Sequence, residues 1–172
     1  MAAISDWYVP YQIAATIFAA ATALTIYGMA RRLTSRGPAL LGAGTYLTAI
    51  CLFHGHGGQS PVFYNLFIAA AAALSLASIP RFESRPAQRA VALAMLLAGI
   101  AITIKTTAVF EAMFLGLFAA GLQIKTGGFR RTTMLRILGW TALGLLPSAL
   151  FAAWYAMSGY WDEYWTAMVL SN

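Results

Sequence analysis

A stretch of 35 almost uncharged residues, 90–124, constrains the fold of this chain more than any other feature. Its two charged residues are Lys105 and Glu111, near the middle. As one straight helix the stretch would be about 52 Å long, whereas the hydrocarbon core of a bilayer is about 30 Å thick. We therefore expect it to fold back on itself, with a tight turn near Lys105. Each arm is then short for a membrane span, roughly 15 to 18 residues.

The composition indicates an integral membrane protein. Hydrophobic residues make up 60% of the chain and charged residues only 9%, against about 25% charged residues in a soluble domain. The single cysteine, Cys51, excludes a disulfide within the chain, and no Cys or His motif predicts a metal site. We therefore predict no metal site and no other cofactor; a divalent cation is an open alternative that no residue pattern supports.

Apolar runs predict an all-α bundle of about six membrane-spanning helices, which together form a single transmembrane domain over residues 1–172. The second and fourth are the shortest. The expected spans are residues 11–30, 39–53, 62–79, 90–104, 108–124 and 135–157.

Basic residues follow every second span. Ten of the 11 therefore fall on one side of the predicted bundle, and Lys105 is the exception. The positive-inside rule makes the basic side cytoplasmic, which predicts a multi-pass protein of a bacterial inner or plasma membrane with both ends outside the cytoplasm. The net charge of +6 then reflects membrane topology, and we expect no nucleic-acid partner. The ten residues are Arg31, Arg32, Arg36, Arg81, Arg85, Arg89, Lys125, Arg130, Arg131 and Arg136.

The first six residues form a polar, acidic leader without the basic and apolar regions of a signal peptide. A start of this kind on the outer side usually needs a preceding helix to insert it. We therefore expect the chain to be a piece of a longer protein, beginning just after a first span and its outer loop. The alternative is a complete small protein with a translocated N-terminus.

Lys105 is the sharpest candidate among the polar groups expected on the outer side. An ionisable residue within the membrane is a functional-site hypothesis by default, and a recessed ammonium beside Thr106 and Thr107 suits a phosphate or diphosphate. The alternative is a lysine that snorkels to the surface. Glu111 lies six residues further on, off the helical stripe of Lys105. It could pair with Lys105 across the turn, be protonated, or contact substrate.

The other candidates on that side are weaker. His54, His56 and Gln59 lie in a glycine-rich loop that could contact a substrate or simply turn the chain. Asp6 precedes the first span, either as a general base or as an exposed tail residue.

Aromatic residues gather near the end of the chain. They predict an aromatic belt at the membrane surface or, alternatively, a platform on which a sugar ring stacks. The two acids among them, Asp162 and Glu163, are expected to form a solvated patch. The aromatic residues are Trp154, Tyr155, Tyr160, Trp161, Tyr164 and Trp165.

Residues 99–111, GIAITIKTTAVFE, resemble the helix, lysine and amphipathic helix of polytopic membrane glycosyltransferases of the C fold type. More narrowly, the chain is similar to the mannosyltransferase-like enzymes that use polyprenyl-phosphate sugars. An arginine pair closes the first span, the loop GGQSPVFYNLF opens the third, and Pro147 with the aromatic exit to Asn172 also fits.

The resemblance implies inverting transfer of a sugar from a polyprenyl-phosphate carrier to an acceptor on the outer face. Lys105, with Thr106 beside it, matches the lysine that holds the lipid phosphate. An acidic residue of the first outer loop would act as base; Asp6 lies too close to the start to be firmly assigned that role. The family's first helix, most of that loop and the soluble C-terminal part have no counterpart, so we expect the chain to be inactive alone.

The partners implied are membrane lipid and the polyprenyl-phosphate sugar donor. Two alternatives from other classes are a membrane transporter and a non-catalytic membrane assembly subunit. A transporter is expected to carry polar groups or broken helices near the bilayer midplane.

Overall fold

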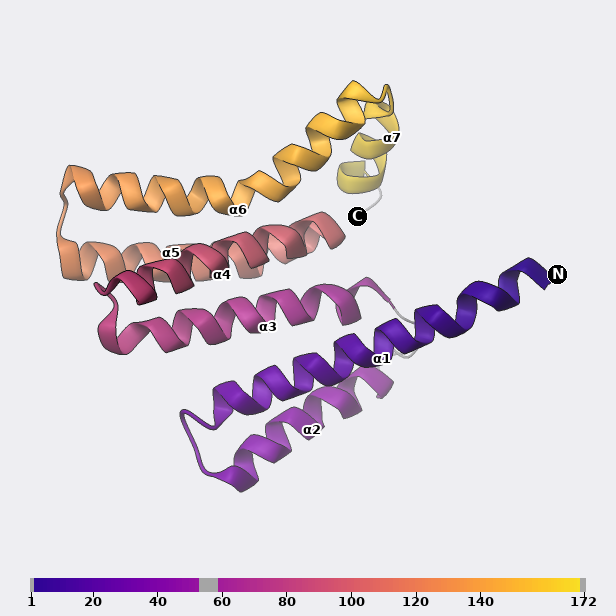
Figure 1. Ribbon diagram of the computed structural model, residues 1–172, viewed down its shortest axis with the longest axis horizontal. Coiled ribbons are helices and arrows are strands. Elements are labelled where there is room, and N and C mark those ends of the chain that lie inside the picture. The colour runs from indigo at the N-terminus through magenta and orange to yellow at the C-terminus, as the bar shows by residue number, and fades with distance from the viewer. Residues whose placement is uncertain (1, 53–58, 171–172) are drawn as a thin grey trace.

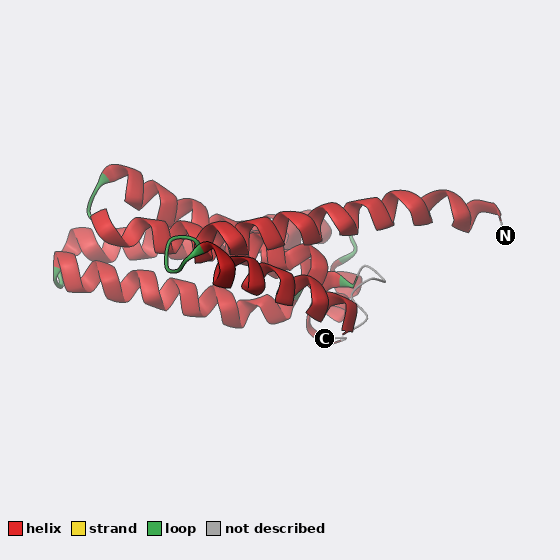
Figure 2. Ribbon diagram, turned by 90° about the horizontal axis from the view of Figure 1, so that it is seen from below, coloured by secondary structure: helices red, strands yellow, loops and turns green. Residues whose placement is uncertain are grey.

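The structure is a computed structural model that describes residues 2–52 and 59–170, with side chains from Val9 onward. This part of the chain is helical and contains no strand, which confirms the predicted all-α class (Figures 1 and 2). The helices are α1 (Ala2–Ala30), α2 (Arg36–Leu52), α3 (Ser60–Ser78), α4 (Arg85–Ile104), α5 (Val109–Gly127), α6 (Arg131–Met157) and α7 (Trp161–Trp165). Short turns of other helix types are η2 (Ile79–Arg81), η3 (Thr106–Ala108) and η4 (Thr166–Leu170).

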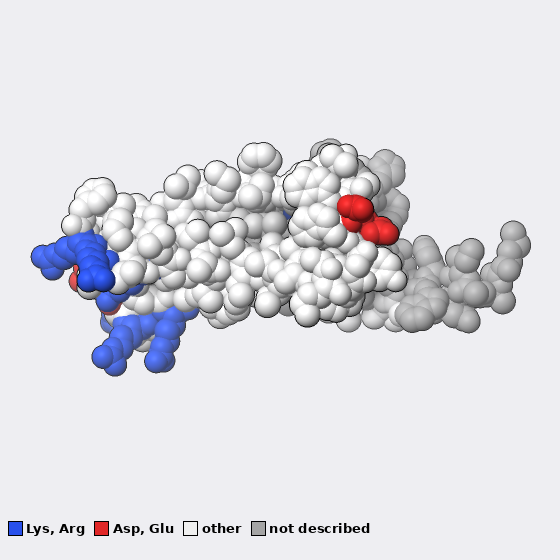
Figure 3. All heavy atoms as spheres, turned by 90° about the horizontal axis from the view of Figure 1, so that it is seen from above, with Lys and Arg blue, Asp and Glu red and all other residues white. Residues whose placement is uncertain are grey.

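Helices α1 to α6 run alternately up and down (Figure 1). The connections after α1, α3 and α5 therefore lie together at one end of the bundle, where the lysines and arginines gather (Figure 3). We call this the basic end. The turn after α4 lies at the opposite end, together with α7; we call this the Lys105 end. The predicted separation of charge along the bundle is confirmed, while the side of the membrane that each end faces stays a prediction.

Five described segments are long and apolar enough to cross a membrane, so the protein is a multi-pass membrane protein. α2 has 17 residues, or a length of about 26 Å, which is at the lower limit for a span. The second predicted span, residues 39–53, therefore stays a prediction, and so does the total of six spans. The five segments are Val9–Ala30, Ser60–Arg81, Arg85–Ile104, Thr106–Gly127 and Arg131–Met157.

The predicted turn at Lys105 is confirmed. Lys105 is extended, with φ −149° and ψ 119°, and η3 follows it before α5 begins. Its backbone N–H donates to the Ala101 carbonyl at 3.0 Å, and its own carbonyl accepts from the Ala108 N–H at 3.0 Å. The stretch 90–124 is therefore two helices joined by a turn of a few residues.

The two arms are longer than predicted. α4 has 20 residues because it begins at Arg85, where the Ser84 hydroxyl caps the helix by accepting from the Ala87 N–H at 3.4 Å. α5 ends at Gly127. Gly128 follows as the C-cap, with a positive φ of 66° that favours glycine. The prediction placed the helix ends where the apolar run ends, but capping and turn residues extend both helices into the basic end.

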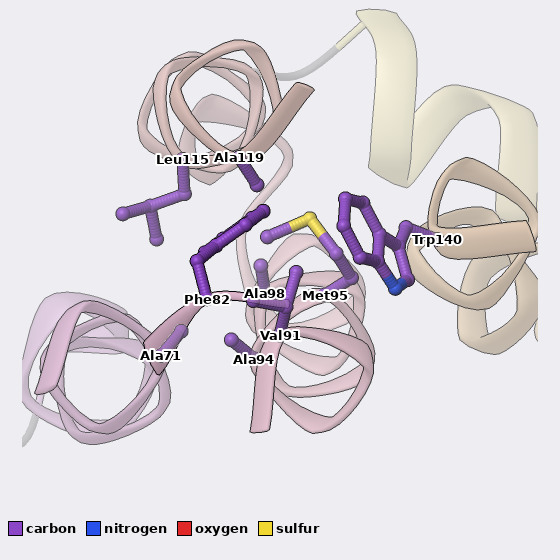
Figure 4. Close-up of a cluster of buried hydrophobic side chains, with 9 residues drawn as sticks. All are labelled: Ala71, Phe82, Val91, Ala94, Met95, Ala98, Leu115, Ala119 and Trp140. Atoms are coloured by element: carbon purple, nitrogen blue, oxygen red, sulfur yellow. The ribbon is translucent and has the colours of Figure 1, made fainter. Parts of the chain in front are cut away.

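α4 is the central helix, and it packs against α3, α5 and α6. In Figure 4 the side chains of Phe82, Met95 and Trp140 point toward one another. The Phe82 and Trp140 rings meet edge to face, 6.1 Å apart. The buried cluster comprises Ala71, Phe82, Val91, Ala94, Met95, Ala98, Leu115, Ala119 and Trp140.

α4 and α6 approach most closely at two glycines. A Cβ atom on Gly99 would overlap the carbonyl oxygen of Gly144 and would lie 3.0 Å from Cδ of Pro147. Small residues at such crossings let helices in lipid pack backbone against backbone. α6 bends near its middle (Figure 1), where Pro147 lies, as expected for proline inside a helix.

The α1–α2 hairpin lies outside this bundle and joins it through α1, which packs on α3. Phe18 of α1 meets Phe63 and Phe67 of α3, with ring centroids 5.3 and 6.1 Å apart. α1 is helical from Ala2, so the leader that was expected to precede the helix is part of it.

Candidate functional site

The candidate site is built around the turn between α4 and α5. Its sequence, ITIKTT over residues 102–107, is dominated by β-branched residues, which lower helix propensity and favour an extended break. The Thr106 hydroxyl donates to the Met168 carbonyl of η4 at 2.8 Å, across 62 residues of sequence. This bond ties the turn to the C-terminal segment that lies against it.

Lys105 is half-buried at this break. The ten other basic residues lie at the opposite end of the bundle (Figure 3). A charge near a protein surface interacts with an anion more strongly than one in bulk water, because the effective dielectric constant is lower. Its position therefore suits an anionic ligand.

Thr106 acts on the turn itself. Its hydroxyl has one proton, and that proton is donated to Met168. The residue therefore positions the Lys105 turn, and direct contact between Thr106 and a phosphate stays a prediction.

Glu111 is exposed in the first turn of α5 and faces α3. The Thr107 side chain lies within hydrogen-bonding reach of the Tyr64 hydroxyl, and Glu111 and Tyr46 lie close enough to that hydroxyl to interact with it electrostatically. The Tyr46 hydroxyl is buried and has no hydrogen-bond partner among the described residues. Three helices thus bring together a polar group that includes two tyrosines the sequence analysis did not single out. The one available signal was that Tyr64 follows the glycine-rich loop.

The remaining predicted residues are not brought to Lys105 by the described part of the structure. Gln59 is exposed and precedes α3 without a side-chain cap bond. Asp6 lies in α1, where its side chain is outside the described residues, and His54 and His56 also lie outside them. Among the side chains that are described, no three of His, Cys, Asp and Glu gather as metal ligands would.

An apolar groove of about 320 Å³ runs between α4, α5 and α6. Ile102 and Val109, on either side of the Lys105 turn, line it, and Met95 and Trp140 line it further along α4 and α6. The groove therefore begins beside the half-buried lysine and extends along the apolar part of the bundle.

A second cavity, which we call the aromatic pocket, has a volume of about 260 Å³ at the Lys105 end. The Tyr155 and Tyr164 rings stack at 5.2 Å with an angle of 30° between them. The sequence analysis predicted that these residues form an aromatic belt or, alternatively, a platform for a sugar ring, and it assigned Glu163 to a solvated patch. The pocket was missed because its walls come from separate segments. They are Thr103, Phe151, Tyr155, Glu163, Tyr164, Ala167 and Met168.

No protein-family model, curated protein or solved structure matches this chain. The resemblance of residues 99–111 to C-fold glycosyltransferases therefore stays a prediction.

Proposed function

We propose that the protein binds a polyprenyl-phosphate sugar at the Lys105 end and takes part in transferring that sugar to an acceptor on the outer face of a bacterial inner membrane. The observation that carries the binding step is a half-buried lysine in a helix break whose flanking residues, Ile102 and Val109, line an apolar groove. The transfer step comes from the resemblance of residues 99–111.

The groove and the lysine together match the two parts of such a lipid. An isoprenoid chain is apolar and suits a groove lined by Ile102, Val109 and Met95. A phosphate is anionic and suits the ammonium of Lys105. Lipid headgroups alone account for basic residues at the other end, where they lie in the connections and near the ends of the helices, but they do not account for a lysine in a helix break.

In the proposed reaction an acceptor hydroxyl oxygen forms a bond to C1 of the sugar, while the bond from C1 to the phosphate oxygen breaks. The electron pair of that bond leaves with the polyprenyl phosphate, and Lys105 stabilises the charge that the phosphate gains. A carboxylate takes the hydroxyl proton. Asp6 is the residue proposed for this role.

The binding step is tested with the protein in lipid nanodiscs and polyprenyl phosphate as the probe. Lys105→Ala is expected to lower affinity at least about tenfold, since it removes a charge-assisted hydrogen bond. Lys105→Arg should retain most of the affinity because it keeps the charge.

Lys125→Ala, at the basic end, is the matched control and should bind like the wild type. Equal affinity of Lys105→Ala and wild type would overturn the assignment of Lys105. A wild-type protein that does not bind polyprenyl phosphate would favour the assembly-subunit alternative.

A further inference from the structure

The aromatic pocket adjoins the proposed phosphate site through two connections. Thr103, which lines the pocket, lies two residues before Lys105. Met168, which also lines it, accepts the hydrogen bond from Thr106. The turn that presents Lys105 therefore lies next to the pocket.

The size of the pocket limits what it holds. Cavities for drug-sized ligands measure about 300–1,000 Å³, and this one measures about 260 Å³. It is large enough for one small ring and too small for an extended ligand.

Its walls present aromatic faces together with hydrogen-bonding groups. Phe151, Tyr155 and Tyr164 supply rings on which a flat apolar face can stack. The Thr103 hydroxyl donates its proton to the Ile100 carbonyl at 2.7 Å and is left with acceptor capacity. Glu163, when ionised, is also an acceptor. A monosaccharide offers hydroxyl donors at its edge and C–H groups on its face, which is the complementary pattern.

The charge of the pocket separates it from the phosphate site. Glu163 would repel a phosphate, so the pocket suits a neutral part of a ligand while Lys105 takes the anion. A quaternary ammonium group also binds aromatic residues near a carboxylate, but it is best held by aromatic faces that surround it. Tyr155 and Tyr164 instead stack on each other at 30°, so the two rings do not enclose a bound group from opposite sides.

We propose that the aromatic pocket binds the sugar of the lipid-linked donor as a single hexose ring, an inference that rests on the proposed function. Along the end of α4, Ile102 lines the apolar groove, Thr103 lines the aromatic pocket and Lys105 forms the turn. The apolar chain, the sugar and the phosphate of one donor molecule thus each meet matching chemistry within four residues of α4 and its turn.

The test compares bare polyprenyl phosphate with polyprenyl phosphates that carry mannose, glucose or galactose, using the protein in nanodiscs. At least one hexosyl carrier is expected to bind at least about fivefold more tightly than the bare carrier. Glu163→Gln and Tyr164→Leu should remove this gain while leaving the affinity for the bare carrier unchanged. That unchanged affinity also shows that the variants are folded.

Asp162→Asn and Trp165→Leu are the matched controls, because both positions are exposed neighbours that do not line the pocket. Both control variants should still bind the hexosyl carrier more tightly than the bare carrier. The proposal is overturned if no hexosyl carrier outbinds the bare carrier, or if the gain survives in both pocket variants. Displacement of the hexosyl carrier by choline but not by methyl hexosides would also overturn it. Failure of the proposed function has a different signature, since the wild type would then not bind the bare carrier at all.

Discussion

α4 carries polar side chains at both of its ends, and the two sets differ in how they are satisfied. At the basic end the Gln88 amide donates to the Phe82 carbonyl at 2.8 Å and to Oε1 of Gln123 at 2.9 Å. Gln123 is only 2% exposed. At the Lys105 end the polar groups are half-buried or exposed and border two cavities.

This difference separates polar groups that hold the fold from those available to a ligand. Buried polar groups that are fully bonded stabilise one packing arrangement. Buried hydroxyls without a partner are unusual in folded proteins, and among the described residues they are those of Tyr46, Ser75 and Ser148. The bonded pair of Gln88 and Gln123 is therefore a structural clamp at the basic end, and ligand chemistry is expected at the other end.

The largest loss of stability is expected from Gly99→Ala, because both ends of the bundle depend on the crossing of α4 and α6. The new Cβ would overlap the backbone carbonyl of Gly144, which cannot move as a side chain can. We expect a loss of about 3 kcal/mol in the free energy of unfolding, measured in detergent micelles, together with weaker binding of polyprenyl phosphate.

Gly144→Ala is the matched control at the same crossing. Its Cβ would meet the Met95 carbonyl oxygen at 3.5 Å, an ordinary contact. Its stability should change by less than about 1 kcal/mol, since alanine also favours a helix. Equal losses of unfolding free energy in Gly99→Ala and Gly144→Ala would contradict the close approach of the two helices at Gly99.

Gln123→Ala is expected to have a smaller effect, confined to the basic end. It removes the acceptor for the Gln88 amide and leaves a small cavity beside it. The free energy of unfolding should fall by about 2 kcal/mol. Affinity for polyprenyl phosphate, measured on the folded protein, should stay the same.

Gln59→Ala, an exposed change at the Lys105 end, should leave stability unchanged. If Gln123→Ala were as stable as Gln59→Ala, the buried amide pair would not be the clamp described above.

The smallest stability effect is expected from Tyr46→Phe. Its hydroxyl has no hydrogen-bond partner among the described residues, so removing it takes away a buried polar group and no described bond. The free energy of unfolding should stay within about 0.5 kcal/mol of the wild type or rise. A loss above about 1 kcal/mol would show that this hydroxyl is satisfied in the protein.

Several features followed from local sequence because their causes are local. The length of the stretch 90–124 forced a turn, and the β-branched run around Lys105 set its position. The spacing of arginines placed the loops at alternating ends. The helix ends were less accurate, since the cap at Ser84 and the left-handed Gly128 extend α4 and α5 beyond the apolar run.

The site itself combines residues that no sequence pattern relates. Thr106 and Met168 are 62 positions apart and share a hydrogen bond, and Tyr64 meets Thr107 and Glu111 from another helix. Hydropathy and charge report whether a residue faces lipid, water or a neighbour, so they are sufficient for the membrane class, the helix order and the isolated lysine. The groove and the aromatic pocket depend on how α6 bends and on where the C-terminal turn comes to rest. Those arise from packing between distant segments, and local composition does not encode them.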